Sequence, residues 1–213
     1  IAQAKKQVKV PMGTLLTKHV RVTVLGTFIM LATYTLFYIM TVYSMTFSTT
    51  AAPAGLGLPR NDVLWMLMMA VIGFGIMVPI AGVLADRFGR RKSMITITSL
   101  IIVFALFVFP PLLGSGNEAL IMAYLLIGLS LMGLTFGPMG ALLPELFPTE
   151  VRYTGASFSY NVSSILGASV APYIATWLQS HYGLFYVGIY LAAMAGLTLI
   201  ALLLTHETSN KAL

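Results

Sequence analysis

The sequence predicts an all-α fold, a polytopic membrane helix bundle with six transmembrane helices. Hydrophobic residues make up 58% of the chain, charged residues only 8%, and the mean hydropathy is +0.92. An ordinary soluble domain, by contrast, is about a quarter charged. Apolar runs long enough to cross a bilayer as helices also alternate with short polar or charged segments. These observations together indicate an integral membrane protein.

One charged loop fixes the predicted topology. The segment GVLADRFGRRKSM, residues 82–94, holds five of the eighteen Lys, Arg, Asp and Glu residues. A charged side chain at the centre of a bilayer costs roughly 3 kcal/mol or more, so this segment is expected to be a tight loop between two spans. Its four cations place it on the cytoplasmic side by the positive-inside rule.

Counting outward from this loop gives the other elements. Residues 1–21 form a cytoplasmic lead with several lysines, and its later part is expected along the membrane interface. Residues 22–205 form the membrane bundle, and residues 206–213 form a cytoplasmic tail. The spans are expected at residues 22–47, 63–84, 93–109, 119–143, 153–178 and 184–204. Both ends of this segment are then cytoplasmic, and every cation-rich loop falls on the same side.

Local signals set the expected boundaries. Asn61 and Asp62 are predicted to cap the second span, because their side-chain oxygens can accept from the free N–H groups of a first helical turn. The third span is expected to end at Pro110 and Pro111. A short link around His181 is expected between the last two spans.

Several classes of function are not favoured by the composition. The chain has no cysteine, which excludes a disulfide framework and a thiolate metal site. Its histidines, His19, His181 and His206, fall outside the predicted spans and far apart. No metal-ligand spacing, nucleophile elbow or phosphate loop is present. We therefore predict no enzyme, no metal and no cofactor, and the net charge of +6 is explained by topology rather than by nucleic acid.

The charged loop resembles a family signature. Its pattern G-x-L-a-D-r-x-G-r-r is similar to that of the major facilitator superfamily, whose carriers have twelve spans in two six-span halves. Met94 stands where that pattern usually has Leu. The matching residues are Gly82, Leu84, Ala85, Asp86, Arg87, Gly89, Arg90 and Arg91. The segment PELFPTEVRYTG, residues 144–155, and the sequence after it resemble the metabolite:proton symporter group of that superfamily, which includes shikimate and proline/betaine carriers.

This resemblance implies a half-carrier. The six spans would correspond to spans seven to twelve, the lead would be the end of a central cytoplasmic linker, and the chain would begin inside a longer polypeptide. An N-terminal six-helix half would then be the missing partner. The charged loop, with Gly82, Asp86, Arg87, Gly89, Arg90 and Arg91, would be a conformational-switch element. In the family, Asp86 would approach the absent half.

Candidates for a solute cavity come from polar residues inside the spans. In the fifth span, small or hydrogen-bonding side chains recur at three- and four-residue steps and form one stripe. Close helix packing is the alternative explanation for such a stripe. Tyrosines in the first and fourth spans are further candidates. The full set of cavity candidates is Tyr34, Tyr38, Tyr124, Ser157, Tyr160, Asn161 and Ser164.

No Asp, Glu, Lys or Arg lies deep within any of the six predicted spans. Glu145 and Arg152 lie at the cytoplasmic edge and are candidate gate residues. Intramembrane carboxylates are the usual proton relays of carriers, so the coupling carboxylate is expected in the missing half.

The glycines around Pro138, in GLTFGPMG, are interpreted as a bending and close-packing device.

The predicted function is one half of a secondary active transporter in the bacterial inner membrane. It would move a small polar metabolite, an organic acid or a zwitterion, by proton symport with alternating access. Its partners would be that metabolite, protons, the lipid bilayer and the missing half. Two alternatives remain open at this point, a drug:proton antiporter and a self-standing six-span channel or structural module.

Overall fold

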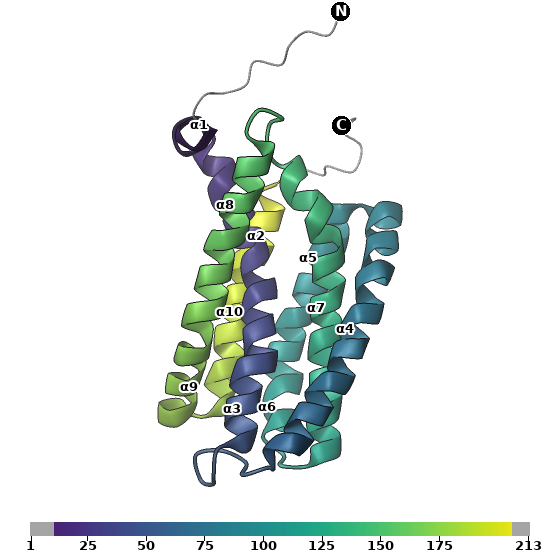
Figure 1. The fold of residues 1–213 in the computed structure, drawn as a ribbon, viewed down its shortest axis with the longest axis vertical. Helices are drawn as coiled ribbons and strands as arrows, with labels where there is room; N and C mark the ends of the chain where they lie inside the picture. The colour runs from purple at the N-terminus through teal and green to yellow at the C-terminus, as the bar shows by residue number, and fades with distance from the viewer. Residues whose placement is uncertain (1–10, 206–213) are drawn as a thin grey trace, which may run out of the picture.

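A computed structural model describes residues 11–205 of the chain. Within this range the protein is built of helices that run up and down one bundle (Figure 1). Residues 1–10 of the expected lead, with Lys5, Lys6 and Lys9, lie outside the described residues, as does the whole expected tail, residues 206–213, with His206.

The six expected spans correspond to six continuous helical units. The first is α2 (Val20–Tyr38), η1 (Ile39–Tyr43) and α3 (Ser44–Thr49), and the second is α4 (Arg60–Phe88). The third is α5 (Arg90–Val103), η2 (Phe104–Val108) and α6 (Phe109–Leu113), and the fourth is α7 (Glu118–Glu145). The fifth is α8 (Arg152–Ile165), η3 (Leu166–Val170) and α9 (Ala171–Tyr182), and the sixth is α10 (Leu184–Leu203).

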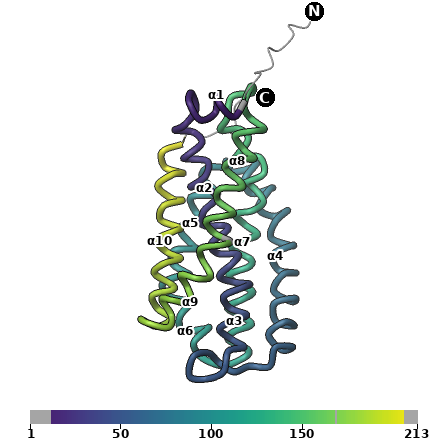
Figure 2. The backbone as a smooth tube through the Cα atoms, turned by 60° about the vertical axis from the view of Figure 1, so that its left-hand side comes forward, coloured from purple at the N-terminus to yellow at the C-terminus, as the bar shows by residue number. Residues whose placement is uncertain are grey.

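Five of these units are long and apolar enough to cross a membrane by length and composition. The fifth unit in chain order, from α8 to α9, is not among them, and α8 is rich in hydroxyl groups. A short helix, α1 (Pro11–Lys18), precedes the first unit and packs against α2 and α8 (Figure 2). The end of α10 lies at the same end of the bundle as α1, as six passes require (Figure 1).

Three predicted boundaries were wrong. Helix α4 begins at Arg60 behind Pro59, whose fixed φ suits the entry to a helix, so Asn61 and Asp62 lie in the first turn and make no cap. The third unit continues to Leu113, because the two prolines fall in the first turn of α6, where missing N–H groups are tolerated. The link around His181 is helical, and Gly183, with φ +93, separates α9 from α10.

Glycines bring α4 and α7 into close contact. A Cβ added at Gly133 would lie 2.6 Å from the carbonyl oxygen of Phe74, and one added at Gly137 would lie 2.5 Å from that of Val78. Small residues allow such close approach of helices in lipid, where packing rather than water drives association. The predicted close-packing role of this segment is therefore confirmed. A Cβ at Gly82 would meet nothing within 4 Å, so the close contact is made by the α7 glycines.

Hydroxyl groups join α2 to its neighbours inside the bundle. Thr33 donates to the hydroxyl of Thr135 on α7 at 3.0 Å, and Ser159 on α8 donates to the carbonyl of Thr23 at 3.2 Å. Ser163 of α8 donates to the carbonyl of Thr27. These buried polar groups are satisfied across helices, and they fix α8 against α2.

Candidate functional site

A cavity of about 650 Å³ opens between α2, α7 and α8. One wall comes from α8 and the other from α7 with one residue of α2, and the loop between α7 and α8 contributes Thr149. Its lining residues are Met30, Phe136, Met139, Gly140, Leu143, Pro144, Thr149, Arg152, Tyr153, Ala156, Ser157, Tyr160 and Asn161.

The α8 wall carries most of the polar groups. Its residues recur four apart in two adjacent rows, 152–156–160 and 153–157–161, which places them on one face of the helix. The Asn161 side chain donates to the carbonyl of Ser157 at 2.8 Å. Ser157, Tyr160 and Asn161 were predicted as cavity candidates, and the structure brings all three together in this lining.

Arg152 is the one charged residue among these lining residues. It is the first residue of α8, and its Nε donates to the carbonyl of Phe147 at 3.5 Å. This contact links the start of α8 to the loop after α7. The predicted gate residue thus lies at the cavity itself.

The opposite wall is apolar and was not predicted. Met30, Phe136, Met139 and Leu143 face the polar side of α8 across the cavity. Each belongs to a nearly uniform apolar run, so neither composition nor spacing distinguishes the residues that face the cavity from those that pack in the core.

Four predicted cavity candidates lie outside the lining. Tyr34 is buried behind Tyr160, with the two rings edge to face and their centroids 5.3 Å apart. Tyr38 is half-buried beside Phe37. Ser164 is half-buried on α8, beyond the last lining residue.

The fourth, Tyr124, is fully buried in the core. Its ring stacks on Phe104 and meets Phe109 edge to face, while its hydroxyl is 2.8 Å from that of Ser44. Its polar tip therefore has a partner inside the bundle. A tyrosine held in this way packs helices rather than lining a cavity.

The charged loop joins four helices at one end of the bundle. Gly89, with φ +96, makes the turn between α4 and α5, a conformation that glycine adopts without strain. Arg90 forms an ion pair with Glu145 at the end of α7, and its Nη2 lies 3.5 Å from an oxygen of Asp86. The side chain of Asp86 is 72% exposed, whereas that of Glu145 is only 12% exposed.

The neighbouring arginines differ in their contacts. Arg91 donates to the carbonyls of Leu202 and Leu203 at 2.8 and 3.0 Å, and so satisfies carbonyls at the end of α10. The guanidinium of Arg87 lies 5.4 Å from the ring centroid of Phe88 on the exposed end of α4. The loop therefore connects α4 and α5 to both α7 and α10.

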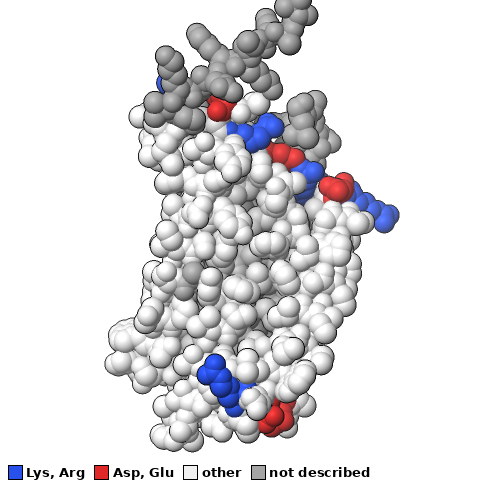
Figure 3. Space-filling view, viewed as in Figure 1, with Lys and Arg blue, Asp and Glu red and all other residues white. Residues whose placement is uncertain are grey.

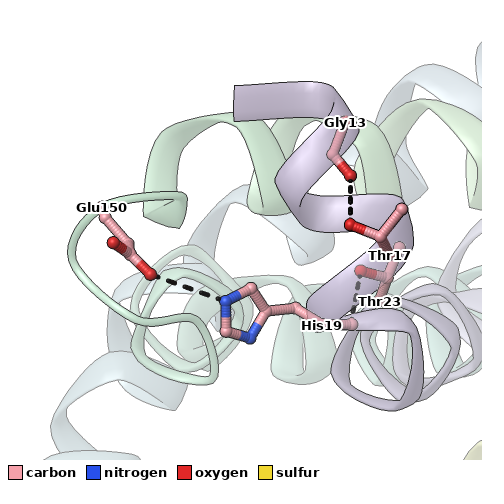
Figure 4. Close-up of polar contacts among 5 residues, drawn as sticks. All are labelled: Gly13, Thr17, His19, Thr23 and Glu150. Carbon is pink, nitrogen blue, oxygen red and sulfur yellow. Dashed lines mark hydrogen bonds and ion pairs between the residues drawn. The ribbon is translucent and has the colours of Figure 1, made fainter. Parts of the chain in front are cut away.

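A second contact at this end involves α1 and the loop after α7. His19, between α1 and α2, lies 3.7 Å from the carboxylate of Glu150 (Figure 4). The hydroxyls of Thr17 and Thr23 bond to the carbonyls of Gly13 and His19, which fixes the backbone around this junction. Glu150 thus links the loop after α7 to the junction of α1 and α2.

Charged side chains gather at this end on the face shown in Figure 3, with a smaller group at the other end and an uncharged belt between them. Among the described residues, no group of three or more His, Asp or Glu side chains could hold a metal ion. The cavity lining offers hydrogen-bonding groups, one cation and an apolar wall.

The family profile and the most similar of the relatives compared here agree on one family. Residues 9–213 match the profile of the Major Facilitator Superfamily. The chain is 84% identical over 213 residues to the inner membrane metabolite transport protein YhjE of Escherichia coli K12, which covers 100% of this chain and 48% of YhjE. It is 46% identical over 215 residues to a putative metabolite transport protein of Haemophilus influenzae, covering 98% of this chain and 49% of that protein.

A more distant relative is the citrate-proton symporter of Klebsiella pneumoniae, 32% identical over 166 residues, covering 76% of this chain and 36% of that protein. No solved structure matches the chain. The chain spans about half the length of the two most similar of these relatives.

Proposed function

The chain belongs to the Major Facilitator Superfamily, and from this membership we propose that it is the C-terminal half of a secondary carrier for a small polar metabolite. The names of its relatives are those of transport proteins rather than enzymes. The proposed solute is an organic acid or a zwitterion, and the proposed mechanism is alternating access between two six-helix halves.

The cavity beside α8 is the observation that carries this proposal. Its volume of about 650 Å³ is within the range of small-molecule sites, and a few polar groups face a mostly apolar wall, as such sites require. Ser157, Tyr160 and Asn161 would hydrogen-bond the solute. Arg152 and Glu145 would serve as gate residues at the cytoplasmic end of the cavity.

We propose that the end bearing the charged loop faces the cytoplasm. The cations of this loop and Lys18 of α1 lie at the same end of the bundle as the α7–α8 loop, which fits the positive-inside rule. Both ends of this segment would then be cytoplasmic in the bacterial inner membrane. YhjE, the E. coli relative, is named as an inner membrane protein.

The missing half would cover an exposed apolar face. Helix α4 packs mainly on α7, and it leaves a row of large side chains uncovered, namely Trp65, Met68, Ile72, Ile76 and Val83. Asp86 is exposed at the end of the same helix, where it could meet a helix terminus of the other half. We therefore assign the loop of Gly82, Asp86, Arg87, Gly89, Arg90 and Arg91 the role of a conformational switch.

Proton symport is proposed with the proton site in the other half. The Klebsiella relative is named a citrate-proton symporter. Among the described residues, the cavity lining contains no carboxylate, and Glu145 is engaged by Arg90 at the edge of the bundle. A titratable carboxylate that couples solute to proton would therefore come from outside this chain.

The test is a chimera in which this chain replaces the corresponding half of E. coli YhjE, referred to below as the YhjE chimera. Reconstituted vesicles would be given an inward proton gradient and offered labelled organic acids and zwitterions. We expect accumulation that requires both the gradient and the two joined halves, and no uptake by this chain alone. Uptake by the chain alone would favour a self-standing channel, and export of lipophilic cations without metabolite uptake would favour a drug antiporter.

A further inference from the structure

The connection between α9 and α10 differs from the other two connections at its end of the bundle. Arg60 and Asp62 follow the loop after α3, and Glu118 follows the loop after α6. Between residues 153 and 205, by contrast, the chain has no Lys, Arg, Asp or Glu. The α9–α10 connection carries a group of ring side chains instead, called the ring cluster below: Trp177, His181, Tyr182, Phe185 and Tyr186.

The rings of the cluster form one continuous surface. Trp177 stacks on His181 with the ring centroids 4.9 Å apart, and it meets Tyr182 edge to face at 5.6 Å. The ring of Tyr182 lies 5.3 Å from that of Tyr186, so the surface crosses Gly183 from α9 to α10. Trp177 and Tyr182 are 52% and 57% exposed. Their rings therefore remain accessible to a partner rather than being enclosed in the core.

The imidazole of His181 is held in place within this surface. Its Nδ1 lies 2.9 Å from the carbonyl oxygen of Trp177 and 3.0 Å from the hydroxyl of Ser180. Because a carbonyl only accepts, Nδ1 carries the proton of the neutral ring and Nε2 keeps a lone pair. His181 is exposed, so the ring cluster combines aromatic faces with a hydrogen-bond acceptor.

The ring cluster lies at the depth expected of a membrane boundary. In both views the turn between α9 and α10 stops short of the loop between α3 and α4 (Figure 1, Figure 2). When that longer loop reaches water, the turn stays within the headgroup layer. Trp and Tyr are enriched in this layer, because each presents an apolar ring together with a polar group.

The bilayer fits this position better than the missing half does. The exposed row assigned to the missing half belongs to α4, and α9 lies on the other side of the bundle in both views (Figure 1, Figure 2). Helix α9 packs against α10, α2, η1 and η3, which leaves the ring cluster outside these contacts. A lipid headgroup is therefore the neighbour that this surface would meet.

The chemistry of the cluster selects among headgroups. Aromatic faces attract a cation, most strongly the face of Trp. The connection has no Lys or Arg that could pair with an anionic headgroup. The free Nε2 of His181 accepts a hydrogen bond, which a primary ammonium can donate and a quaternary ammonium cannot.

We propose that the ring cluster binds the headgroup of a phospholipid that ends in a primary ammonium group. The ammonium would lie against the exposed rings and donate to Nε2 of His181. This lipid site is separate from the solute cavity, and it goes beyond the proposed transport function because it does not depend on which solute is moved.

The first measurement locates the ring cluster in the bilayer. The YhjE chimera would be placed in vesicles that carry a nitroxide quencher either on the headgroup or in the middle of the acyl chain. The signal of Trp177 is the difference in emission between the unaltered chimera and Trp177→Phe. We expect stronger quenching by the headgroup label. Quenching by neither label would show that the other half covers the cluster, and stronger quenching by the acyl-chain label would place it in hydrocarbon; either result overturns the proposal.

The second measurement tests headgroup selectivity. Native mass spectrometry of the purified YhjE chimera would compare retention of phosphatidylethanolamine, phosphatidylcholine and phosphatidylglycerol at equal concentration. The variants are Trp177→Leu, which removes the best cation-binding ring, and His181→Phe, which keeps a ring but removes the acceptor. Phe107→Leu is the matched control, because Phe107 is a 71% exposed ring on η2, outside the cluster.

We expect the unaltered chimera to retain phosphatidylethanolamine best. Trp177→Leu should lower that retention roughly fivefold, His181→Phe should bring it to the level of phosphatidylcholine, and Phe107→Leu should leave it unchanged. Equal retention of the three lipids, or unchanged selectivity in both cluster variants, would overturn the proposal. If Trp177→Leu unfolds at a lower temperature than the unaltered chimera, His181→Phe decides the outcome. No transported solute is needed, so failure here leaves the proposed transport function standing.

Discussion

The hydroxyl of Thr198 on α10 accepts a hydrogen bond from the backbone N–H of Ala32 on α2, at 3.0 Å. The same hydroxyl donates to the carbonyl of Phe28 at 2.7 Å. Residues 28 and 32 are the acceptor and donor that a regular α-helix pairs directly. Thr198 is fully buried. Its hydroxyl, on the last span, therefore bridges the carbonyl of Phe28 and the N–H of Ala32 on the first span.

Replacing Thr198 by valine should loosen the contact between α10 and α2. Valine keeps the shape of the threonine side chain but cannot hydrogen-bond to Ala32 and Phe28. The N–H of Ala32 can then bond to the carbonyl of Phe28 within its own helix. Because hydrogen bonds between membrane helices are modest, we expect a loss of roughly 1 kcal/mol in unfolding free energy. The thermal unfolding of the YhjE chimera, followed by circular dichroism, measures it.

Thr176→Val is the control for that substitution. Thr176 is exposed, and its hydroxyl bonds to the carbonyl of Pro172 within α9. Its replacement should change stability by no more than about 0.5 kcal/mol. Equal effects of the two substitutions would show that the bridge adds nothing to the bundle.

Gly137→Ala should separate α4 from α7. The added methyl group would lie 2.5 Å from the carbonyl oxygen of Val78 and 2.9 Å from the Cβ of Ala81, so the helices must move apart. Overpacking of this kind costs roughly 1–3 kcal/mol. Gly196→Ala on α10 is the matched control, since its methyl group would meet nothing within 4 Å. A stability of Gly137→Ala equal to that of the control would contradict the close packing.

Glu145→Gln should destabilise the end of the bundle that bears the charged loop. It would leave the Arg90 guanidinium, 21% exposed, without its less exposed carboxylate partner. Since this pair is only partly buried, we expect a cost of roughly 2 kcal/mol, measured by thermal unfolding. The double variant with Arg90→Gln should cost less than the sum of the single variants, because the two side chains act as a pair. Additive costs would show that Arg90 and Glu145 are not coupled.

Asp86→Asn should impair transport without impairing membrane insertion. Asp86 is 72% exposed and lies 3.5 Å from Arg90 in an exposed contact, which contributes little to stability. Its proposed role is toward the missing half, so the rate of solute uptake by the YhjE chimera should fall while the inserted amount stays the same. Uptake at the unaltered rate would show that Asp86 is not part of the conformational switch.

The fold was largely predictable because charge and apolar length determine where a chain can cross a bilayer. All six expected spans correspond to helical units, although their ends shifted. Pro110 and Pro111 suggested an end, since a proline disrupts a helix interior, but the chain places them in the first turn of α6. Sequence alone does not show where such a turn begins.

The candidate site was predictable only where polarity marks a helix face. Ser157, Tyr160 and Asn161 stand out because they recur at three- and four-residue steps along one face of α8, which is rich in hydroxyl groups. Tyr124 also carries a hydroxyl inside a span, yet Phe104 and Phe109 enclose it in the core. The pairing of Arg90 with Glu145 joins residues far apart in sequence, so it depended on the packing of α4, α5 and α7.

Two methionines in the cavity wall, Met30 and Met139, provide internal reporters for spectroscopy. Their terminal methyl groups, once isotopically labelled, give nuclear magnetic resonance signals that shift when a neighbouring group changes. Because one belongs to α2 and the other to α7, the two signals would register events on different helices. Solute arrival could thus be followed without attaching a dye or altering any side chain.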